Sequence, residues 1–296
     1  MQKPAILASE NGWLKIAFSG DFSTARTAFC GQCFRFRFLQ GEFPPPPAGC
    51  GAAVFGIAQG RAVAFADDGT YLYVYASAED FENIWQHYLS LDADYESANE
   101  KILHALSGAG QAHMHAALHA ARGIRLLRQD PWETLCSFIL SQNNNIPRIR
   151  KIIEALCQAY GEEIPGGHAF PTPRALANAG RDAIFSLGAG FRADYIWEAA
   201  GKIAEGTFSL SRVQEAETYE EARQMLCTLR GVGPKVSACV LLFGLDRTEA
   251  FPIDVWMQKV IDRRFGGNLD PAVFGNWAGL AQQYLFYYER TAARSS

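Results

Sequence analysis

The spacing of the apolar residues changes once along this chain, near residue 79, and this change constrains the fold more than any other feature. Before it, CFRFRF (residues 33–38), RAVAFA (61–66) and TYLYVYA (70–76) alternate with a period of two between Gly and Asp turns, which predicts strands. The proline-rich residues 41–51 form a rigid loop between two of these strands. After it, the spacing is largely helical. We therefore expect an α+β fold, with an antiparallel sheet and flanking helices over residues 1–115 and a larger all-helical domain over residues 116–296.

Three of the predicted helices begin at residues that typically cap helix N-termini. Ser77 precedes the first, and Asp130 precedes the second, where Pro131 takes the first helical position. Thr218 and Glu221 form a capping box at the third. Because a cap satisfies backbone amides that have no partner inside the helix, these residues predict where each helix starts.

The composition is that of an ordinary globular protein, with 49% hydrophobic and 20% charged residues among 296. No apolar run reaches the length of a membrane span, and the N-terminal residues lack the charged start and apolar core of a secretion signal. We expect an intracellular protein without membrane association, in the cytoplasm or nucleoid, or in the nucleus if the source is a eukaryote.

The seven cysteines favour reduced thiols over disulfides, because their number is odd and they are scattered through apolar helical patterns. Cys30 and Cys33 have C-x-x-C spacing, but no second pair follows for a zinc site and no βαβ pattern surrounds them for a redox site. We interpret the pair as accidental spacing in a strand and expect no metal site.

A basic neighbourhood surrounds three consecutive asparagines, residues 143–145. The net charge of −4 argues against a nucleic-acid partner, but binding needs only a local patch. Asparagine is a poor interior helix residue, so the three indicate a joint between helices. From charge alone, a solvated helix face is the simpler interpretation. Between residues 122 and 151 the basic residues are Arg122, Arg125, Arg128, Arg148, Arg150 and Lys151, and the acidic ones are Asp130 and Glu133.

Residues 226–246, LCTLRGVGPKVSACVLLFGLD, are predicted to form two helices joined by Gly231, Val232 and Gly233. Two glycines allow a turn too tight for side chains and leave backbone amides bare, and Pro234 suits the first position of the next helix. Such amides can bind a phosphate oxygen without reading any base. A plain helical hairpin also favours glycine, so this pattern alone leaves both interpretations open.

Lys235 and Asp254 favour a chemical role. A lysine in the first turn of a helix is disfavoured by the helix dipole, and the same positive end, with burial, favours the neutral amine that a nucleophile requires. Asp254 precedes another helix and can cap it. A carboxylate held there stays ionised and can stabilise a cationic sugar transition state. The combination indicates covalent chemistry at a sugar carbon.

The segments LRGVGPKVSACV and PIDVWMQKV resemble the helix-hairpin-helix, Gly-Pro/Val-Asp superfamily of base excision DNA glycosylases, and within it the 8-oxoguanine DNA glycosylase/AP lyases. Alkyl-base glycosylases lack the lysine of this hairpin. Endonuclease III and adenine-mismatch glycosylases usually carry a four-cysteine iron–sulfur loop, whereas no cysteine follows Cys239 here. Further similar segments follow in the order of the family: GQCFRF (31–36), YLSLDADY (88–95), RLLRQDPWETLCSFILSQNNNIPRI (125–149), LGAGFRADYI (187–196) and WAGLAQQYLF (277–286).

The resemblance implies a lysine Schiff-base mechanism. Lys235 would attack C1′ of the damaged nucleotide, and Asp254 would be its electrostatic and proton-handling partner. Where many relatives have a histidine near the phosphate backbone, this chain has Trp256. The phosphate contacts implied by the resemblance are Gly231, Val232, Gly233 and Trp256.

The resemblance also implies a pocket for the extruded base. The carbonyl of Gly31 would accept the N7–H that oxidation adds to guanine. Phe286 and Cys239 would stack on the two faces of the base, and Gln282 would bind its Watson–Crick edge. Helical spacing places Gln282 with Phe286, and Lys235 with Cys239, on common faces. Without the resemblance, Phe286 and Cys239 read as ordinary core residues.

Extruding a base leaves a gap and an unpaired partner base. The resemblance implies that Asn143, Arg148 and Arg192 fill this gap, while Phe191, a tyrosine in many relatives, acts as a wedge. We interpret Asn144 and Asn145 as caps. Because cytosine offers acceptors at O2 and N3, two arginines predict a preference for cytosine opposite the lesion.

The expected function is therefore excision of 8-oxoguanine, followed by strand cleavage through β-elimination. The expected partner is double-stranded DNA containing a damaged base, bound by a monomer. We expect no metal in catalysis, no iron–sulfur cluster and no other cofactor, although the hairpin carbonyls can hold a monovalent cation, as in relatives. The alternatives are a glycosylase for another damaged base and a non-catalytic helix-hairpin-helix DNA-binding protein.

Overall fold

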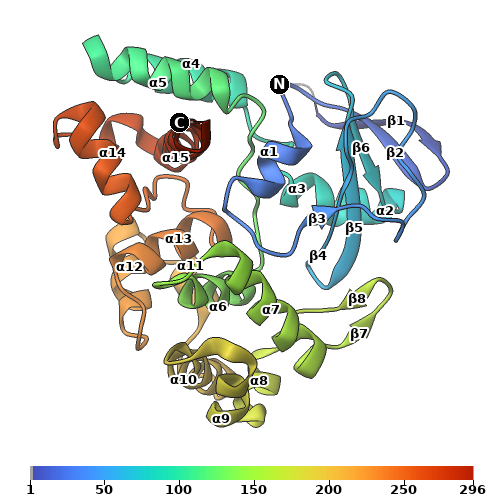
Figure 1. Ribbon diagram of the computed structural model, residues 1–296, viewed down its shortest axis with the longest axis vertical. Helices are drawn as coiled ribbons and strands as arrows, with labels where there is room; N and C mark the ends of the chain where they lie inside the picture. Colours follow the sequence, from blue (N-terminus) through green and yellow to red (C-terminus); the bar gives the residue numbers. More distant parts are fainter. Residues whose placement is uncertain (1–2, 296) are drawn as a thin grey trace.

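The computed structural model describes residues 3–295 and opens with a six-stranded antiparallel sheet (Figure 1). The strand order is β1-β2-β6-β5-β4-β3, so β6 pairs with both β2 and β5, with Trp13 and Ala64 each opposite Tyr75. The strands are β1 (Ala5–Glu10), β2 (Trp13–Ala17), β3 (Arg37–Phe38), β4 (Val54–Ala58), β5 (Arg61–Asp67) and β6 (Leu72–Tyr75).

The two faces of the sheet are covered by different segments. On one face, apolar side chains of the strands form a core with α1 (Thr24–Phe29) and with the helical residues 78–88, which comprise α2 (Ala78–Asp80), the π-helical turn η1 (Phe81–Trp85) and α3 (Gln86–Tyr88). On the other face lies the predicted proline-rich loop. Phe43 stacks on Tyr75 at 4.3 Å between ring centroids, and Trp13 donates to the carbonyl of Pro44 at 3.1 Å.

The predicted strands at residues 61–66 and 70–76 are confirmed as β5 and β6, but the strand predicted at residues 33–38 is mostly wrong, because only Arg37 and Phe38 pair. The alternation there has another cause. Phe34 packs into the core of the helical domain, and Phe36 packs into the core of the sheet domain. The segment therefore runs between the two cores and buries one phenylalanine in each.

Cys30 and Cys33 consequently do not lie in a strand. Cys30 follows the last residue of α1, and Cys33 lies in the irregular segment after it. All seven cysteines, which fall within the described residues, are free thiols, as predicted. Burial raises the pKa of the Cys30 thiol to about 12, so neither a redox nor a metal role is favoured.

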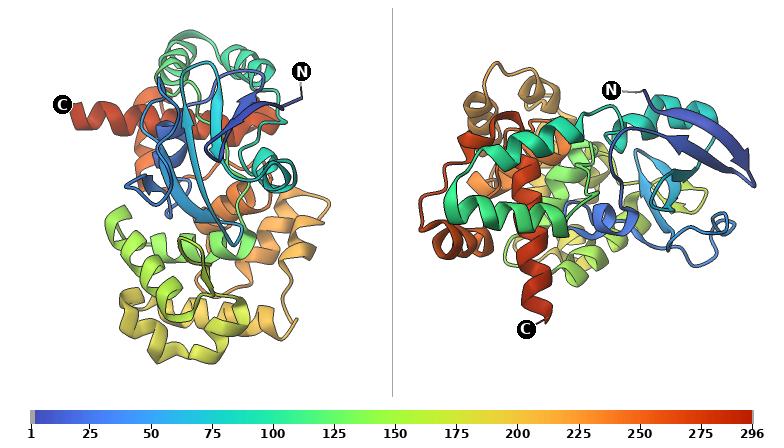
Figure 2. Two further views of the ribbon diagram at one scale, coloured as in Figure 1. Left: turned by 90° about the vertical axis from the view of Figure 1, so that its right-hand side faces the viewer. Right: turned by 90° about the horizontal axis from the view of Figure 1, so that it is seen from above.

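The rest of the chain is a mainly helical body, as expected, with one short hairpin. Helix α5 packs against α14 and α15, and α4 packs against α5 and η3, although α4 and α5 are far from α14, α15 and η3 in sequence (Figure 2). The expected domain boundary after residue 115 lies inside α5, which packs against α15. The elements are α4 (Tyr95–His104), α5 (Gly108–Ala120), α6 (Pro131–Ser141), α7 (Ile146–Tyr160), β7 (Glu163–Ile164), β8 (Gly167–His168), α8 (Pro173–Ala179), α9 (Arg181–Ile184), η2 (Phe185–Ala189), α10 (Arg192–Ala204), α11 (Leu210–Gln214), α12 (Tyr219–Cys227), α13 (Pro234–Gly244), α14 (Val255–Phe265), η3 (Pro271–Trp277) and α15 (Ala278–Ser295).

The predicted helix starts are confirmed. The side chain of Ser77 accepts from the amide of Asp80 at 3.0 Å, and that of Asp130 accepts from the amide of Glu133 at 2.7 Å. Thr218 likewise caps α12 by accepting from the amide of Glu221 at 3.1 Å.

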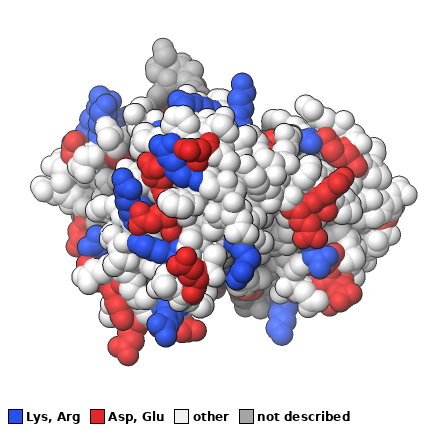
Figure 3. All heavy atoms as spheres, turned by 90° about the horizontal axis from the view of Figure 1, so that it is seen from below, with Lys and Arg blue, Asp and Glu red and all other residues white. Residues whose placement is uncertain are grey.

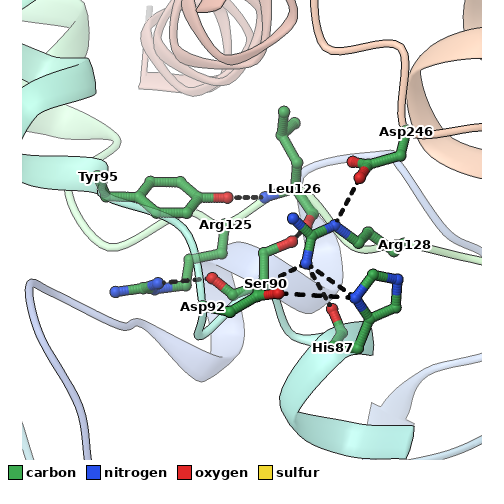
Figure 4. A network of polar contacts seen from close by, with 8 residues as sticks. All are labelled: His87, Ser90, Asp92, Tyr95, Arg125, Leu126, Arg128 and Asp246. Carbon is green, nitrogen blue, oxygen red and sulfur yellow. Dashed lines mark hydrogen bonds and ion pairs between the residues drawn. The ribbon is translucent and has the colours of Figure 1, made fainter. Parts of the chain in front are cut away.

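The connector between α5 and α6 ties the sheet domain to the helical body through two arginines (Figure 4). Arg125 is fully buried and donates to the carbonyls of Ser19, Asp21 and Ser90 at 2.6, 3.0 and 2.8 Å. Arg128 lies 2.5 Å from Asp92 and 3.0 Å from Asp246, which follows α13. Arg125 thus fastens the connector to the sheet domain, and Arg128 links Asp92 of that domain to the residues after α13.

The surface shown in Figure 3 carries interspersed Lys, Arg, Asp and Glu side chains, without one dominant patch of either sign. Within the described part of the chain, no helix combines the length and apolarity needed to cross a membrane.

Candidate active site

The predicted helical hairpin is confirmed, with α12 and α13 joined by residues 228–233. Gly231 has φ +80°, and a Cβ there would collide with the ring of Tyr195. Pro234 takes the first position of α13, directly after Gly233 as its N-cap. The turn therefore requires glycine at position 231 both for its backbone conformation and for space.

Lys235 extends from the first turn of α13 toward the end of α6. Its Nζ donates to Oγ of Ser141 at 3.0 Å and lies 5.0 Å from the ring centroid of Phe138. The Ser141 hydroxyl in turn donates to the carbonyl of Phe138 at 2.8 Å, which orients its lone pairs toward the amine. The sequence analysis did not predict a role for Ser141. Serine is common near helix ends, and nothing in the sequence indicates that this one contacts Lys235.

Asp254 caps α14 by accepting from the amide of Met257 at 2.7 Å, as predicted. The thiol of Cys239 places Lys235 and Asp254 in one electrostatic environment. Burial raises the pKa of Cys239 to about 11, while the charge of Lys235 and a hydrogen bond to it lower that pKa and the charge of Asp254 raises it. The Cys239 thiol therefore lies near both the amine of Lys235 and the carboxylate of Asp254.

A cavity of about 730 Å³ opens beside these residues. It brings together five residues predicted for the site: Lys235, Asp254, Gly31, Phe286 and Trp256. Ser141, Arg150 and Arg290 also line it, and sequence reasoning assigned none of these three to the site.

Gly31 lies close to the aromatic wall of this cavity. It has φ +101°, and a Cβ there would be 3.2 Å from Phe286 and 3.3 Å from Nη1 of Arg290. The guanidinium of Arg290 in turn lies 5.2 Å from the ring of Phe286. A side chain at position 31 would thus be strained and would narrow the space beside Phe286.

Gln282 lies on α15 one turn from Phe286, as helical spacing predicted, but its side chain is buried. Its Nε2 donates to the carbonyl of Pro252 at 3.2 Å, and its Oε1 accepts from Gln283 at 2.8 Å. Its amide is thus engaged within the protein, and contact with a base edge stays a prediction.

The predicted capping roles of two asparagines are confirmed. Asn144 donates to the carbonyl of Leu140 at 3.0 Å and accepts from the amide of Asn145 at 2.9 Å. Asn145 accepts from the amide of Arg148 at 3.0 Å and so caps α7. Asn143 is different, since it has φ +46° and its side chain is exposed. At this joint Asn143 therefore has an exposed side chain, whereas Asn144 and Asn145 stabilise the helix ends.

Arg192 differs from its predicted environment. Only 3% of it is exposed, and it donates to the carbonyls of Gln142, of Asn143 at 2.8 Å and of Ala189 at 3.2 Å. It therefore holds the asparagine joint against α10 and has little surface to offer a base. Arg148, by contrast, is exposed, and its guanidinium donates to the carbonyl of Gly188 at 3.3 Å.

Phe191 is 49% exposed, which is unusual for so large an apolar side chain. The guanidinium of Arg192 lies 4.4 Å from its ring, and Tyr195 packs edge-on at 5.8 Å. The ring is thus braced from the protein side and projects outward close to the joint, as a wedge requires.

Two family descriptions match this chain. Residues 15–135 match the 8-oxoguanine DNA glycosylase N-terminal domain, and residues 136–272 match the HhH-GPD superfamily base excision DNA repair proteins. A structure of MBOgg1 in complex with a low-affinity DNA ligand is 33% identical, has a TM-score of 0.87, and aligns over 99% of this chain and 100% of that one. The chain belongs to the HhH-GPD superfamily.

Other HhH-GPD relatives extend this similarity. The Clostridium acetobutylicum 8-oxoguanine glycosylase/lyase, in complex with dsDNA containing cytosine opposite 8-oxoG, is 27% identical with a TM-score of 0.86 and aligns over 99% of this chain and 100% of that one. The N-glycosylase/DNA lyase of Saccharomyces cerevisiae is 39% identical over 159 residues, which is 49% of this chain and 42% of the yeast protein. The expected family and α+β fold are therefore confirmed.

The matches to curated relatives are partial. They span 42%, 65% and 54% of the proteins from Saccharomyces cerevisiae, Methanothermobacter thermautotrophicus and Arabidopsis thaliana. Across residues 3–295, no three His, Cys, Asp or Glu side chains converge as metal ligands.

Proposed function

We propose that this protein is a bifunctional DNA glycosylase/AP lyase that extrudes 8-oxoguanine from double-stranded DNA, excises it and cleaves the strand. One observation carries the proposal: Lys235, Asp254, Gly31 and Phe286 line a single cavity although they come from distant parts of the chain. A phosphate-binding hairpin alone would need neither the lysine nor the aspartate.

Lys235 is the nucleophile in this proposal. Its neutral amine attacks C1′, the glycosidic bond breaks, and the base leaves with the bonding electrons and takes up a proton. The bond from C1′ to the ring oxygen then opens to give the imine. Loss of a proton from C2′ breaks the C3′–O bond and releases the 3′ phosphate. Ser141, at 3.0 Å, orients the amine, and the Asp254 carboxylate stabilises the positive charge that develops on the sugar.

The choice of base rests on Gly31 and Phe286. The Gly31 carbonyl accepts the N7–H that distinguishes 8-oxoguanine from guanine, and Phe286 and Cys239 stack on the two faces of the base. Because normal guanine has an acceptor at N7, it would leave the Gly31 carbonyl unpaired and would be rejected.

The exposed residues Asn143, Arg148 and Phe191 occupy the gap in the duplex. The donors of Arg148 suit O2 and N3 of an unpaired cytosine, which favours cytosine as the opposite base. Support comes from the Clostridium acetobutylicum relative, whose structure holds cytosine opposite 8-oxoG. The protein acts as a monomer, and the backbone amides of the hairpin at residues 231–233 bind the phosphate backbone. A monovalent cation, if bound, would be held by the hairpin carbonyls and would supply positive charge for the phosphate.

Borohydride trapping tests this function. The substrate is a duplex with one 8-oxoguanine opposite cytosine, and the variants are Lys235→Gln and, as a matched control, Lys101→Gln on the distant helix α4. We expect a covalent protein–DNA product with the native protein and the control, and none with Lys235→Gln. Strand cleavage without any trapped product would contradict the imine, and absence of both cleavage and base release would leave a non-catalytic DNA-binding protein.

A further inference from the structure

A second cavity, of about 520 Å³, lies along α7 on the side that faces the sheet and the β7–β8 turn. We call it the basic cleft. Its volume is in the range of small-molecule sites. Its polar and charged lining residues are Arg35, Arg37, Arg150, Lys151, Glu154 and Gln158.

The charges of the basic cleft are unbalanced, with four basic residues against Glu154 in a protein whose net charge is −4. Two of the basic residues have acidic neighbours. Nη1 of Arg37 lies 2.6 Å from Glu42, and Nη1 of Arg35 lies 3.7 Å from Glu133. Although Arg35 is nearly buried, that same Nη1 has no hydrogen-bond acceptor among the residues that the structure describes.

Arg150 and Lys151 have no acidic partner within 4.0 Å in the described part of the chain. Burial lowers the pKa of Arg150, the nearby Cys33 opposes this shift, and the nearby charge of Arg37 adds to it. Four cations thus line one cleft with Glu154 as the one acid in its lining, and Arg150 and Lys151 form no ion pair with that acid. Such an arrangement costs free energy unless an anion completes it.

Two apolar side chains of β4, Phe55 and Ile57, form one wall of the basic cleft. Gly167 lies against β4, where a Cβ would be 2.9 Å from the side chain of Ile57. Phe55 receives the guanidinium of Arg37 at 4.7 Å from its ring, which fixes that cation at the edge of the cleft. The cleft is therefore a shaped, partly apolar pocket with donors at one side, as anion sites in proteins often are.

We propose that the basic cleft is a second anion site that binds a phosphate group through Arg150 and Lys151, with Arg37 at its edge. Two sources share this chemistry. Arg150 and Phe34 line both the basic cleft and the reaction cavity, so a DNA strand passing the reaction cavity can place a backbone phosphate here. The other source is a free phosphate ester. The site requires no chemistry at Lys235, and so stands apart from the proposed excision.

Calorimetric titration of the DNA-free protein with inorganic phosphate tests the site directly. The variant is Arg37→Gln/Lys151→Gln, and Lys101→Gln is the matched control. We expect saturable binding to the native protein and the control, weakened at least fivefold in the double variant. Circular dichroism of all three proteins verifies that the fold is intact.

The salt dependence of binding to an undamaged duplex separates the two sources. If the cleft holds a DNA phosphate, the slope of log K against log salt falls by about 1 for each cation that is removed, and the control keeps the native slope. If the cleft holds a free phosphate ester, only the calorimetric binding is lost.

An unchanged slope together with unchanged or absent phosphate binding would overturn the second anion site. Borohydride trapping with the double variant keeps this result distinct from the proposed function. The double variant should give the trapped product whether or not the cleft binds phosphate. If the native protein gave no trapped product, that result would count against the proposed glycosylase and not against the anion site.

Discussion

Arg125 and Lys235 are both cations held inside the protein, but their surroundings differ in one decisive way. Arg125 is fully buried, and backbone carbonyls accept from its three side-chain nitrogens. Lys235 donates to Ser141 and otherwise borders a cavity of about 730 Å³. A cation whose N–H groups all donate to protein acceptors stabilises the fold, whereas a cation that borders a cavity can bind a ligand. The same contrast separates Arg192 from Arg148 at the asparagine joint.

The largest effect is expected at the cavity. Lys235→Gln should lower single-turnover excision of 8-oxoguanine by roughly a thousandfold or more, since the nucleophile is lost. The free energy of unfolding should change by less than about 1 kcal/mol, because the side chain is only half-buried. Rapid-quench kinetics and urea denaturation measure the two. A variant that lost stability and DNA binding together would make Lys235 a structural residue like Arg125.

Arg125→Met should have the opposite pattern. Three buried carbonyls would lose their donors, so we expect a loss of about 3 kcal/mol in unfolding free energy. The rate of excision per folded molecule should stay near the native value. Urea denaturation followed by activity at a temperature well below the transition checks this. Native stability in Arg125→Met would show that the connector network contributes little.

Glu133 extends the comparison to an acidic side chain. It is largely buried, and its carboxylate lies 3.7 Å from the guanidinium of Arg35. Burial raises its pKa to about 7, and the charge of Arg35 offsets this only in part. A raised pKa means that the folded state holds the proton more tightly, so the stability from this group is complete at low pH and is lost as pH rises through about 7. Between roughly pH 5 and 8 the native protein should therefore lose about 2–3 kcal/mol of unfolding free energy through this group. The Glu133→Gln variant should not show this loss. Thermal unfolding of both proteins over that pH range measures the difference. If the stability of the native protein and of Glu133→Gln changed with pH in parallel, the prediction would be wrong.

The smallest effects should separate the two arginines at the joint. Arg192→Met should cost about 2 kcal/mol of stability, because the carbonyls of Gln142 and Asn143 lose their donor. Arg148→Gln should leave stability within about 0.5 kcal/mol and reduce the preference for cytosine over adenine opposite the lesion by about five- to tenfold. Excision from duplexes that differ only in the opposite base measures the preference. If Arg192→Met alone altered it, the buried arginine would have to move on binding DNA.

Local patterns predicted local structure well. The caps at Ser77, Asp130 and Thr218, the glycine turn at residue 231 and the strands β5 and β6 follow from interactions within a few residues. The exception was residues 33–38, where alternate side chains enter two different cores, and a period of two cannot distinguish that from a strand. The positions of Lys235, Asp254, Gly31 and Phe286 in one site came from the resemblance to a family and not from spacing.

The amino-acid sequence by itself determined where the capped helices begin, where the hairpin turns, and which residue types are available for chemistry, because these depend on short-range sterics and hydrogen bonds. Only the tertiary structure decided that Ser141 accepts a hydrogen bond from the amine of Lys235 and that Arg192 donates to backbone carbonyls. It also decided that Arg37 and Arg150 line the same basic cleft. Burial and partners set whether a charged side chain is structural or functional, and both arise from contacts between residues far apart in the chain.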